Sequence, residues 1–369
     1  MARMPKRMLL LALVCWLGFV ACGGPKNTDA PVSDDGQPVL VDIGKKFQIT
    51  QPYFEMAFSR VPPANRYQYL TPAGKRDFLE KLAIESVYYL EGVRRRLFKA
   101  PEFKKILDLR QYSALNEEVR RELLKNITVT DEQVKAFYDQ TIKHPEQVPF
   151  ADIKEKLRYQ LLSKALDDAY AAKKTELMAQ FQVKINYELI EKIKPGDKPE
   201  NYPAATEALA TGADYTYTIG QLLKRIEEMP RDAKAKLKET KLAREMLEYV
   251  IGEDVVHHYA ELQGLDKTAE FELRKKVVEV GTLSYVTRGE IVGHEIKATI
   301  AEAKAYYDKH VKDFVSDGET PSFEQVKDAA LARASDEKQE QATRGLAQSL
   351  MAHRYPTVYF EPQIKQYLQ

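Results

Sequence analysis

The adjacent histidines His257 and His258 are the residues best suited by type to bind a metal ion. Neighbouring residues of a helix point about 100° apart, whereas two histidines that share a metal on one helix lie four positions apart. No His-Glu-x-x-His pattern occurs in the chain. Two histidines on a helix surface are the simpler interpretation, and we expect no metal site.

Acidic pairs at Asp167-Asp168 and Glu227-Glu228 are the candidates for acid–base chemistry. Both pairs lie in strongly charged, helical stretches, where solvated carboxylates explain them. The chain has neither a glycine-rich phosphate loop nor a Gly-x-Ser-x-Gly nucleophile motif. We expect no catalytic residue, no cofactor and no enzymatic activity.

The N-terminus has the charge order of an export signal. Basic residues precede an uncharged apolar run, residues 8–21, which is too short to cross a bilayer. Ala21 directly before Cys22 resembles the lipobox of bacterial lipoproteins, although Phe19 stands where leucine is usual. That resemblance implies a signal peptide of residues 1–21 and lipidation of Cys22. An ordinary signal peptide beside a chance cysteine is the alternative.

Removal of residues 1–21 would take three cations and change the formal net charge from +1 to about −2 (+1 − 3 = −2). Cys22 would then be the only cysteine, which leaves no disulfide and no cysteine-based metal site. Residues 22–38, rich in Gly, Pro, Asp and Ser, would form a flexible tether with a reach of roughly 20–24 Å. Charged residues make up 30% of the chain, which excludes a membrane-embedded body, and the near-neutral charge gives no reason to expect nucleic acid.

The chain contains a long internal repeat. Residues 49–124 recur 168 positions later, as Phe54 and Leu222 illustrate (222 − 54 = 168). Lys135-Ala-Phe-Tyr-Asp139 then recurs as Lys304-Ala-Tyr-Tyr-Asp308 (304 − 135 = 169). A repeat of this length indicates one duplicated domain rather than a solenoid of short units, and equivalent positions should be buried alike. Further pairs in register are Thr50 with Thr218, Phe58 with Ile226, Leu79 with Leu247, Glu85 with Glu253, and Arg120 with Arg288.

The repeat predicts two tandem domains, residues 39–191 and 213–369, joined by a linker at residues 192–212 that is rich in helix-breaking residues. Each domain would be mainly α-helical with short β-strands. We expect the first and last strands of each domain to pair and to tie its ends together.

Local patterns place the elements of the first repeat. Short strands are expected at residues 39–43, 47–49 and 183–187, and an apolar stripe at helical spacing predicts a helix over residues 78–97. Thr130 with Gln133 forms a capping-box pattern. The second repeat follows the same order, with Thr218 and Gln221 as its capping box and strands at residues 215–217 and 357–360.

A known family shows the same order of elements. A short strand, the phrase Ile49-Thr-Gln, amphipathic helices and then Ile127-Thr-Val-Thr-Asp-Glu-Gln-Val-Lys-Ala-Phe-Tyr-Asp139 resemble the chaperone core of the SurA/PrsA family of extracytoplasmic foldases. The first repeat is similar over Val39–Ile190 and the second more loosely over Tyr215–Leu368. The resemblance implies two tandem SurA N-terminal-like helical domains, of the trigger-factor/SurA peptide-binding kind.

The parvulin peptidyl-prolyl isomerase domain of that family is missing. Ten residues separate Asp139 from Phe150, and fourteen separate Asp308 from Phe323. Domains below about 40 residues rarely fold without disulfides or metals, so neither loop can hold a catalytic module. The resemblance therefore implies a chaperone core without isomerase chemistry.

Tyrosine is abundant, with 21 residues, and combines a large apolar ring with a polar tip that suits adaptable binding. Most tyrosines should pack in the core. Tyr67, Tyr69, Tyr88 and Tyr89 are the candidates for lining a groove that binds client proteins. The run Arg94–Arg96 is explained by the favourable interaction of cations with a helix C-terminus.

The sequence thus favours a lipoprotein chaperone, or holdase, that binds unfolded or partly folded exported proteins, or one specific envelope partner. Gly23 after the lipidated cysteine favours the outer membrane over the inner one, with the body facing the periplasm. A structural or assembly subunit of a secretion or surface-polysaccharide machine is the main alternative. A peptidyl-prolyl isomerase of another kind is the third.

Overall fold

The computed structural model describes residues 32–34, 36–143, 146, 148–193, 197–228, 240–315 and 320–368. Within these ranges the protein is mainly α-helical with a few short strands, as the sequence predicts. The predicted signal peptide and the lipidation site Cys22 lie outside the described residues.

The elements of the first repeat are β1 (Val39–Ile43), β2 (Phe47–Thr50), α1 (Gln51–Ser59), α2 (Pro63–Arg66), η1 (Tyr67–Tyr69), α3 (Pro72–Arg94), η2 (Leu97–Lys99), α4 (Pro101–Leu124), α5 (Asp131–Thr141), α6 (Phe150–Gln180), β3 (Lys184–Ile185) and η3 (Tyr187–Lys192). The predicted linker, residues 192–212, contains η4 (Pro199–Asn201), and its last part forms β4 (Ala208–Thr211), the counterpart of β1 at the offset of 168, so the second repeat begins near residue 208 rather than at 213. Those of the second are β4 (Ala208–Thr211), β5 (Thr216–Thr218), α7 (Ile219–Glu228), α9 (Thr240–Leu262), η5 (Leu265–Lys267), α10 (Ala269–Ile291), α11 (Ile300–Lys309), η6 (Val311–Phe314), α12 (Phe323–His353), β6 (Thr357–Tyr359) and α13 (Glu361–Leu368).

The predicted helix starts are confirmed by their caps. The Thr50 side chain accepts a hydrogen bond from the backbone N–H of Tyr53 at the start of α1. Thr130 and Gln133 form a reciprocal capping box at α5. Thr218 and Gln221 exchange the corresponding bonds at α7. Each cap satisfies backbone groups that the first turn of a helix leaves unpaired.

The strands pair between the repeats. β6 of the second repeat lies antiparallel to β1 of the first, giving the sheet order β2-β1-β6. β3 of the first repeat lies antiparallel to β4 of the second, giving the order β3-β4-β5. The expectation that the first and last strands of one repeat pair with each other is therefore wrong. The sequence of a short strand does little to select its partner strand. The packing of the helices therefore determines which strands pair.

The two largest hydrophobic cores of the body are shared by the repeats. One contains Leu115, Tyr170 and Leu177 of the first repeat together with Leu222 and Leu247 of the second. The other core combines the beginning of the first repeat with the end of the second. It contains Leu40, Phe54 and Leu79 of the first repeat together with Tyr355 and Ile364 of the second. The linker therefore joins two sequence repeats that pack against each other, and its last residues, Leu209 and Ala210, are part of the first core.

Positions that the repeat equates are buried alike, which confirms the alignment. Phe54 and Leu222 each expose 3% of their surface, and Leu79 and Leu247 expose 0% and 1%. The first pair lies on α1 and α7, and the second on α3 and α9.

The helices of the body also pack across the repeats. α3 packs along α10, and its counterpart α9 packs along α4, while α4 and α10 contact each other. Gly92 lies at the crossing of α3 and α10. A Cβ atom there would lie 2.3 Å from the Thr287 Oγ1 atom and 2.8 Å from the Leu283 Cγ atom. The absence of a side chain therefore allows the two helices to come this close.

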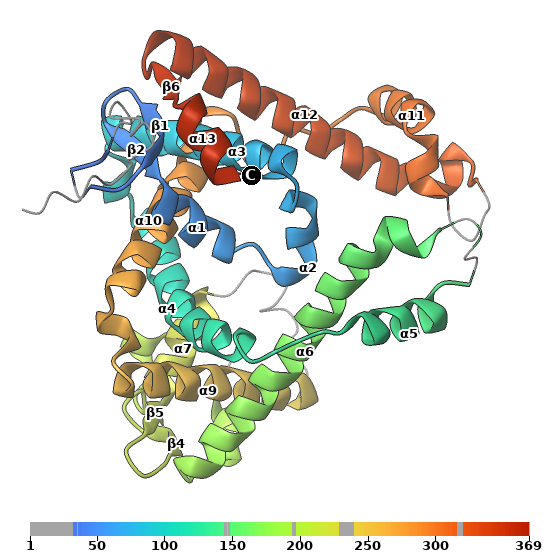
Figure 1. Ribbon diagram of the computed structural model, residues 1–369. Coiled ribbons are helices and arrows are strands. Elements are labelled where there is room, and N and C mark those ends of the chain that lie inside the picture. The colour runs from blue at the N-terminus through green and yellow to red at the C-terminus, as the bar shows by residue number, and fades with distance from the viewer. Residues whose placement is uncertain are drawn as a thin grey trace, which may run out of the picture.

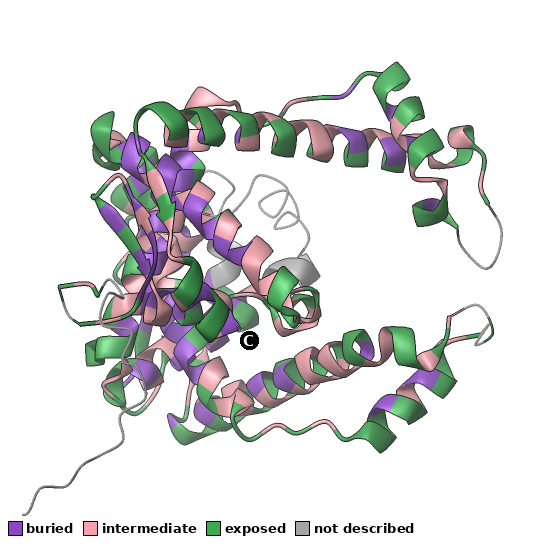
Figure 2. Ribbon diagram, turned by 45° about the horizontal axis from the view of Figure 1, so that its top comes forward, coloured by how far each residue is buried: buried purple, intermediate pink, exposed green. Residues whose placement is uncertain are grey.

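Two arms extend from this body in the same general direction (Figure 1). One arm is the hairpin of α5 and α6, and the other is the hairpin of α11 and α12. Burial is concentrated in the body, and the arms are largely exposed or half-buried along their length (Figure 2). Among the described residues, no helix is both long and apolar enough to span a membrane.

Candidate functional site

The tip of the first arm is fixed by the side chains of Lys135-Ala-Phe-Tyr-Asp139. The Tyr138 ring is buried against Phe150, with ring centroids 5.2 Å apart. Its hydroxyl donates a 2.8 Å hydrogen bond to the carbonyl oxygen of Val148. The Lys135 Nζ atom lies over the Tyr138 ring and 2.7 Å from a carboxylate oxygen of Asp139.

The tip of the second arm repeats these contacts. Tyr307 packs on Phe323 with ring centroids 5.9 Å apart, and its hydroxyl donates a hydrogen bond to the Pro321 carbonyl oxygen. Lys304 lies over the Tyr307 ring and pairs with Asp308. Each tip therefore has its own small core, separate from the two largest cores of the body.

The predicted client-binding tyrosines divide into two groups. Tyr88 is fully buried, and its hydroxyl donates a 2.8 Å hydrogen bond to the Thr343 carbonyl oxygen on α12. It presents no surface to a client. Tyr89 is half-buried and packs against Phe47, with ring centroids 5.6 Å apart. These two residues hold α3 in the body.

Tyr67 and Tyr69 lie on η1, which follows α2 and contacts α6. Both keep part of their surface exposed. Tyr69 packs on Phe78 with a centroid distance of 5.2 Å, and the Lys81 Nζ atom lies 5.3 Å from its ring centre. This segment lies at the base of the space between the arms (Figure 1). Of the four predicted tyrosines, only Tyr88 is fully buried, and the other three keep part of their surface exposed.

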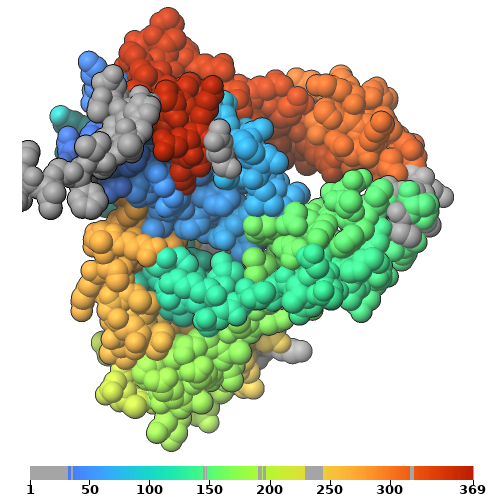
Figure 3. All heavy atoms as spheres, in the orientation of Figure 1, coloured from blue at the N-terminus to red at the C-terminus, as the bar shows by residue number. Residues whose placement is uncertain are grey.

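Space-filling representation shows a hollow between the arms. The surface formed by α11 and α12 and the surface formed by α5 and α6 leave an opening beside the first repeat's N-terminal helices (Figure 3). A cavity of about 370 Å³ lies at the junction of α1, α2, α4 and α6. Its size falls within the range of ligand-binding pockets.

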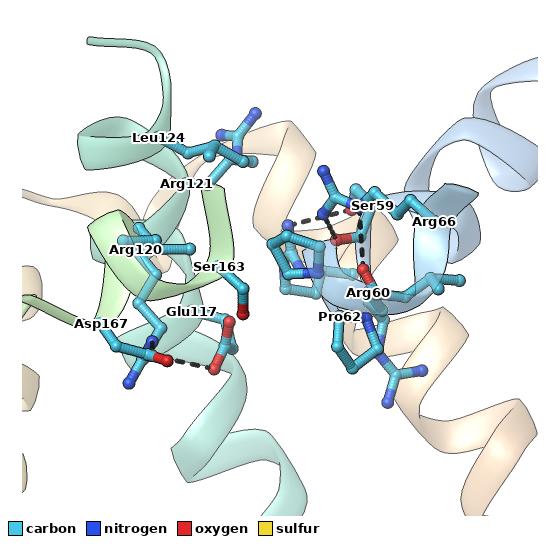
Figure 4. Close-up of a pocket in the computed structure, with 14 residues that line it drawn as sticks. Ser59, Arg60, Pro62, Arg66, Glu117, Arg120, Arg121, Leu124, Ser163 and Asp167 are labelled. Atoms are coloured by element: carbon cyan, nitrogen blue, oxygen red, sulfur yellow. Dashed lines mark hydrogen bonds and ion pairs between the residues drawn. The ribbon is translucent and has the colours of Figure 1, made fainter. Parts of the chain in front are cut away.

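Arginine is the commonest residue in the wall of this cavity, which we call the arginine cavity. One wall comes from α4 and α6, and the facing wall from the end of α1 and from α2 (Figure 4). The lining residues are Ser59, Arg60, Val61, Pro62, Pro63, Arg66, Glu117, Arg120, Arg121, Leu124, Ser163, Leu166, Asp167 and Arg274.

Three of these arginines have acidic partners. The Arg120 Nη1 atom lies 2.9 Å from an Asp167 oxygen. Arg121 lies 2.8 Å from Glu118, and the buried Arg274 also pairs with Glu118. Acidic partners of this kind hold the guanidinium groups in fixed positions.

Arg66 is held in a different way. Its Nε atom donates to the Val61 carbonyl oxygen at 2.8 Å, and its Nη2 atom donates to the Ser59 carbonyl oxygen at 2.7 Å. Burial lowers the pKa of the Arg66 guanidinium, and the nearby charge of Arg274 lowers it further. Burial also raises the pKa of the Glu117 carboxyl in the facing wall. The sequence did not indicate this cavity, because its residues come from four separate segments.

A second cavity, of about 300 Å³, lies where α3, α10 and α12 meet. Burial raises the pKa of its Glu85 carboxyl. Within the described part of the chain, the Ser284 Oγ and Arg288 Nε atoms in its wall are buried without hydrogen-bond partners. The equivalent of Glu85, Glu253, accepts a 2.9 Å hydrogen bond from the hydroxyl of Tyr170.

The histidines considered for metal binding, and Asp167 among the acidic candidates, have structural contacts. His257 stacks on Tyr112 with ring centroids 4.0 Å apart, and burial lowers its pKa. His258 packs against Phe181, with ring centroids 5.4 Å apart. Asp167 pairs with Arg120 as described above. Among the described residues there is no cluster of side chains that would hold a metal ion.

Other predicted features also have structural partners. Arg225 pairs with Glu228 at 3.3 Å. Of the run Arg94–Arg96, Arg94 and Arg95 bind the buried carboxylate of Glu91 at 2.6 and 2.8 Å. Comparisons of the chain with protein-family models, with curated proteins and with solved structures found no match.

Proposed function

We propose that this protein binds unfolded or partly folded exported polypeptides in the space between its two arms. The single observation that carries the proposal is the pair of arms, each with its own small core at the tip, projecting from one body. An extended chain held there would contact both arms and the half-exposed tyrosines Tyr67 and Tyr69 at the base. Binding would be non-covalent.

The resemblance to the SurA/PrsA chaperone core supports this proposal, because the resemblance includes the residues that build the arm tips. The short loops between α5 and α6 and between α11 and α12 support a holdase without prolyl isomerase chemistry. The lipobox-like sequence supports lipid anchoring at Cys22, and Gly23 supports the outer membrane, with the arms facing the periplasm.

Site-specific photocrosslinking tests the location of the bound chain. A photoreactive residue at Tyr67 should crosslink to an unfolded outer-membrane protein. The same residue at Val358, which is 50% exposed on the distant strand β6, should not. Equal crosslinking at both positions would contradict binding between the arms.

Aggregation assays separate a general holdase from a dedicated subunit. The protein should slow aggregation of several unrelated unfolded proteins at near-stoichiometric ratio and leave the cis/trans relaxation of a proline peptide at its uncatalysed rate, tens of seconds. Co-purification with one partner at fixed stoichiometry, without any effect on aggregation, would favour the assembly subunit instead. Saturable acceleration of the proline relaxation would refute the absence of isomerase activity.

A further inference from the structure

The arginine cavity carries more positive than negative charge. Its wall contains five arginines, and the carboxylates that share the wall or pair with these arginines are four, those of Glu117, Glu118, Asp167 and Glu270. Among the described residues, neither Arg60 nor Arg66 has a carboxylate within ion-pair distance. The charge of Glu85 acts on Arg60 and that of Glu117 acts on Arg66, but neither carboxylate forms an ion pair with them, so both guanidinium groups can still bind an anion that enters the cavity.

Three of these arginines have no cationic counterpart in the other repeat. Arg120 has a basic counterpart in the other repeat, Arg288 (288 − 120 = 168). Arg66 aligns with Lys234 (234 − 66 = 168), which lies outside the described residues. The residues equivalent to Arg60, Arg121 and Arg274 are Glu228, Gly289 and Ile106.

The shape of the cavity suits a side chain of a polypeptide. Pro62 and Pro63 form a rigid apolar part of one wall, and Leu124 and Leu166 form an apolar part of the other (Figure 4). A carboxylate on a short aliphatic stem would place its charge beside the guanidinium groups and its stem against these residues. Guanidinium groups bind carboxylates through paired, charge-assisted hydrogen bonds.

Glu117 and Asp167 repel any anion that enters, and the arginines attract it, so the apolar part of the wall decides between ligands. Pro62, Pro63, Leu124 and Leu166 favour a carboxylate on an aliphatic stem over inorganic phosphate. The cavity lies between α2 and the middle of α6, two helices that contact each other, and α2 leads directly into the segment η1 that carries Tyr67 and Tyr69.

We propose that the arginine cavity is a subsite for aspartate and glutamate side chains of the bound polypeptide. This inference rests on the proposed function and adds a preference to it: client segments that carry acidic residues next to apolar ones. Arg60 and Arg66 are the binding residues, and Arg120, Arg121 and Arg274, each paired with a carboxylate, complete the wall.

Two matched peptides test the preference. Both are unstructured and alternate leucine or tyrosine with a variable residue, which is aspartate or glutamate in one and asparagine or glutamine in the other. The wild-type protein should bind the acidic peptide about tenfold more tightly by fluorescence anisotropy, and the difference should shrink as salt is raised.

Two variants alter the charge of the cavity in different ways. Arg60→Gln/Arg66→Gln removes two cations, and Ser163→Glu adds a carboxylate to the wall while every arginine remains. Each should weaken binding of the acidic peptide roughly tenfold and leave binding of the neutral peptide unchanged. Arg96→Gln, which removes a cation at an exposed residue outside the cavity, should change neither affinity. Ser163→Glu keeps the test decisive should the double variant fail to fold.

The outcomes distinguish the subsite from the proposed function. The subsite would be overturned, and polypeptide binding left intact, by either of two results. One is equal affinity of the wild-type protein for the two peptides, and the other is an equal loss of affinity for both peptides in the variants. Binding of neither peptide would overturn the proposed function. Saturable binding of inorganic phosphate that displaces the acidic peptide, and that both variants abolish, would assign the cavity to phosphate and overturn the polypeptide subsite.

Discussion

Val41 of the first repeat and Tyr359 of the second are Cα partners across the antiparallel strands β1 and β6. Ile185 of the first repeat is likewise the partner of Ala210 of the second, across β3 and β4. Each sheet is thus completed by a strand from the other repeat, and the cores beneath the sheets are shared in the same way. We expect the two halves to fold as one cooperative unit.

Cleavage of the chain between the two repeats tests whether they fold as one cooperative unit. A protease site inserted near Lys198 in the linker, followed by cleavage, should leave the two fragments bound to each other on gel filtration. Expressed alone, residues 39–191 should aggregate or self-associate, because half of each core is missing. A monomeric fragment with a cooperative thermal transition of its own would contradict the shared cores.

Gly92→Ala should destabilise the protein by roughly 1–3 kcal/mol, because the added methyl group would collide with Thr287 and Leu283 at the crossing of α3 and α10. Gly345→Ala is the matched control, since that helical glycine is exposed and has open space around it. The control should be neutral or stabilising by up to about 1 kcal/mol. Urea unfolding measures both. Equal effects of the two substitutions would refute the close crossing.

Glu91 should contribute stability that depends on pH. Its buried carboxylate accepts hydrogen bonds from Arg94, Arg95, Arg354 and Tyr355, and those from Arg94 do most to hold its pKa well below the usual range. A carboxyl with a lowered folded-state pKa stabilises the fold above its unfolded-state pKa, near 4.3, and loses this contribution as the pH falls toward the folded-state value.

Glu91→Gln should therefore cost about 3–5 kcal/mol at pH 7 by leaving buried partners uncompensated. The difference in unfolding free energy between wild type and variant should narrow steadily below pH 5. A difference that stays constant from pH 7 to pH 3 would show that the ionised form makes no special contribution.

Glu85 should have the opposite effect on stability: ionisation of its carboxyl should destabilise the fold. Burial raises the pKa of its carboxyl, so ionisation is less favourable in the folded state than in the unfolded state. Glu85→Gln should stabilise the protein at pH 7, and the gain should disappear as the pH falls below the unfolded-state pKa near 4.3. A loss of stability at pH 7 would mean that Arg288 or another cation holds the carboxylate ionised.

Cys22→Ser should release the protein from the membrane fraction or leave the uncleaved precursor, because acyl chains contribute roughly 0.8 kcal/mol per buried methylene to membrane binding. Fractionation and intact mass measure the effect. An unchanged mass and an unchanged membrane fraction would rule out lipidation at this residue.

Features set by neighbouring residues could be predicted from the sequence. The capping boxes at Thr130 and Thr218 and the burial of Leu79 and Leu247 follow from local patterns and the repeat. The partner of β6 could not be predicted, because both strand pairings satisfy the same local patterns. The burial of a single residue could not be predicted either. Tyr88 is fully buried because it faces α12, whereas its neighbour Tyr89 is half-buried.

Tyr170 on α6 and Thr343 on α12 occupy corresponding positions (343 − 170 = 173, as 323 − 150 = 173 for the helix starts). Tyr170 fills its site and binds Glu253, whereas Thr343 lines an open cavity beside Glu85. In a symmetric dimer of identical chains, one mutation alters both sites at once. Because this chain encodes the two sites separately, a mutation alters one of them alone, and one site can acquire a new ligand while the other goes on maintaining the fold.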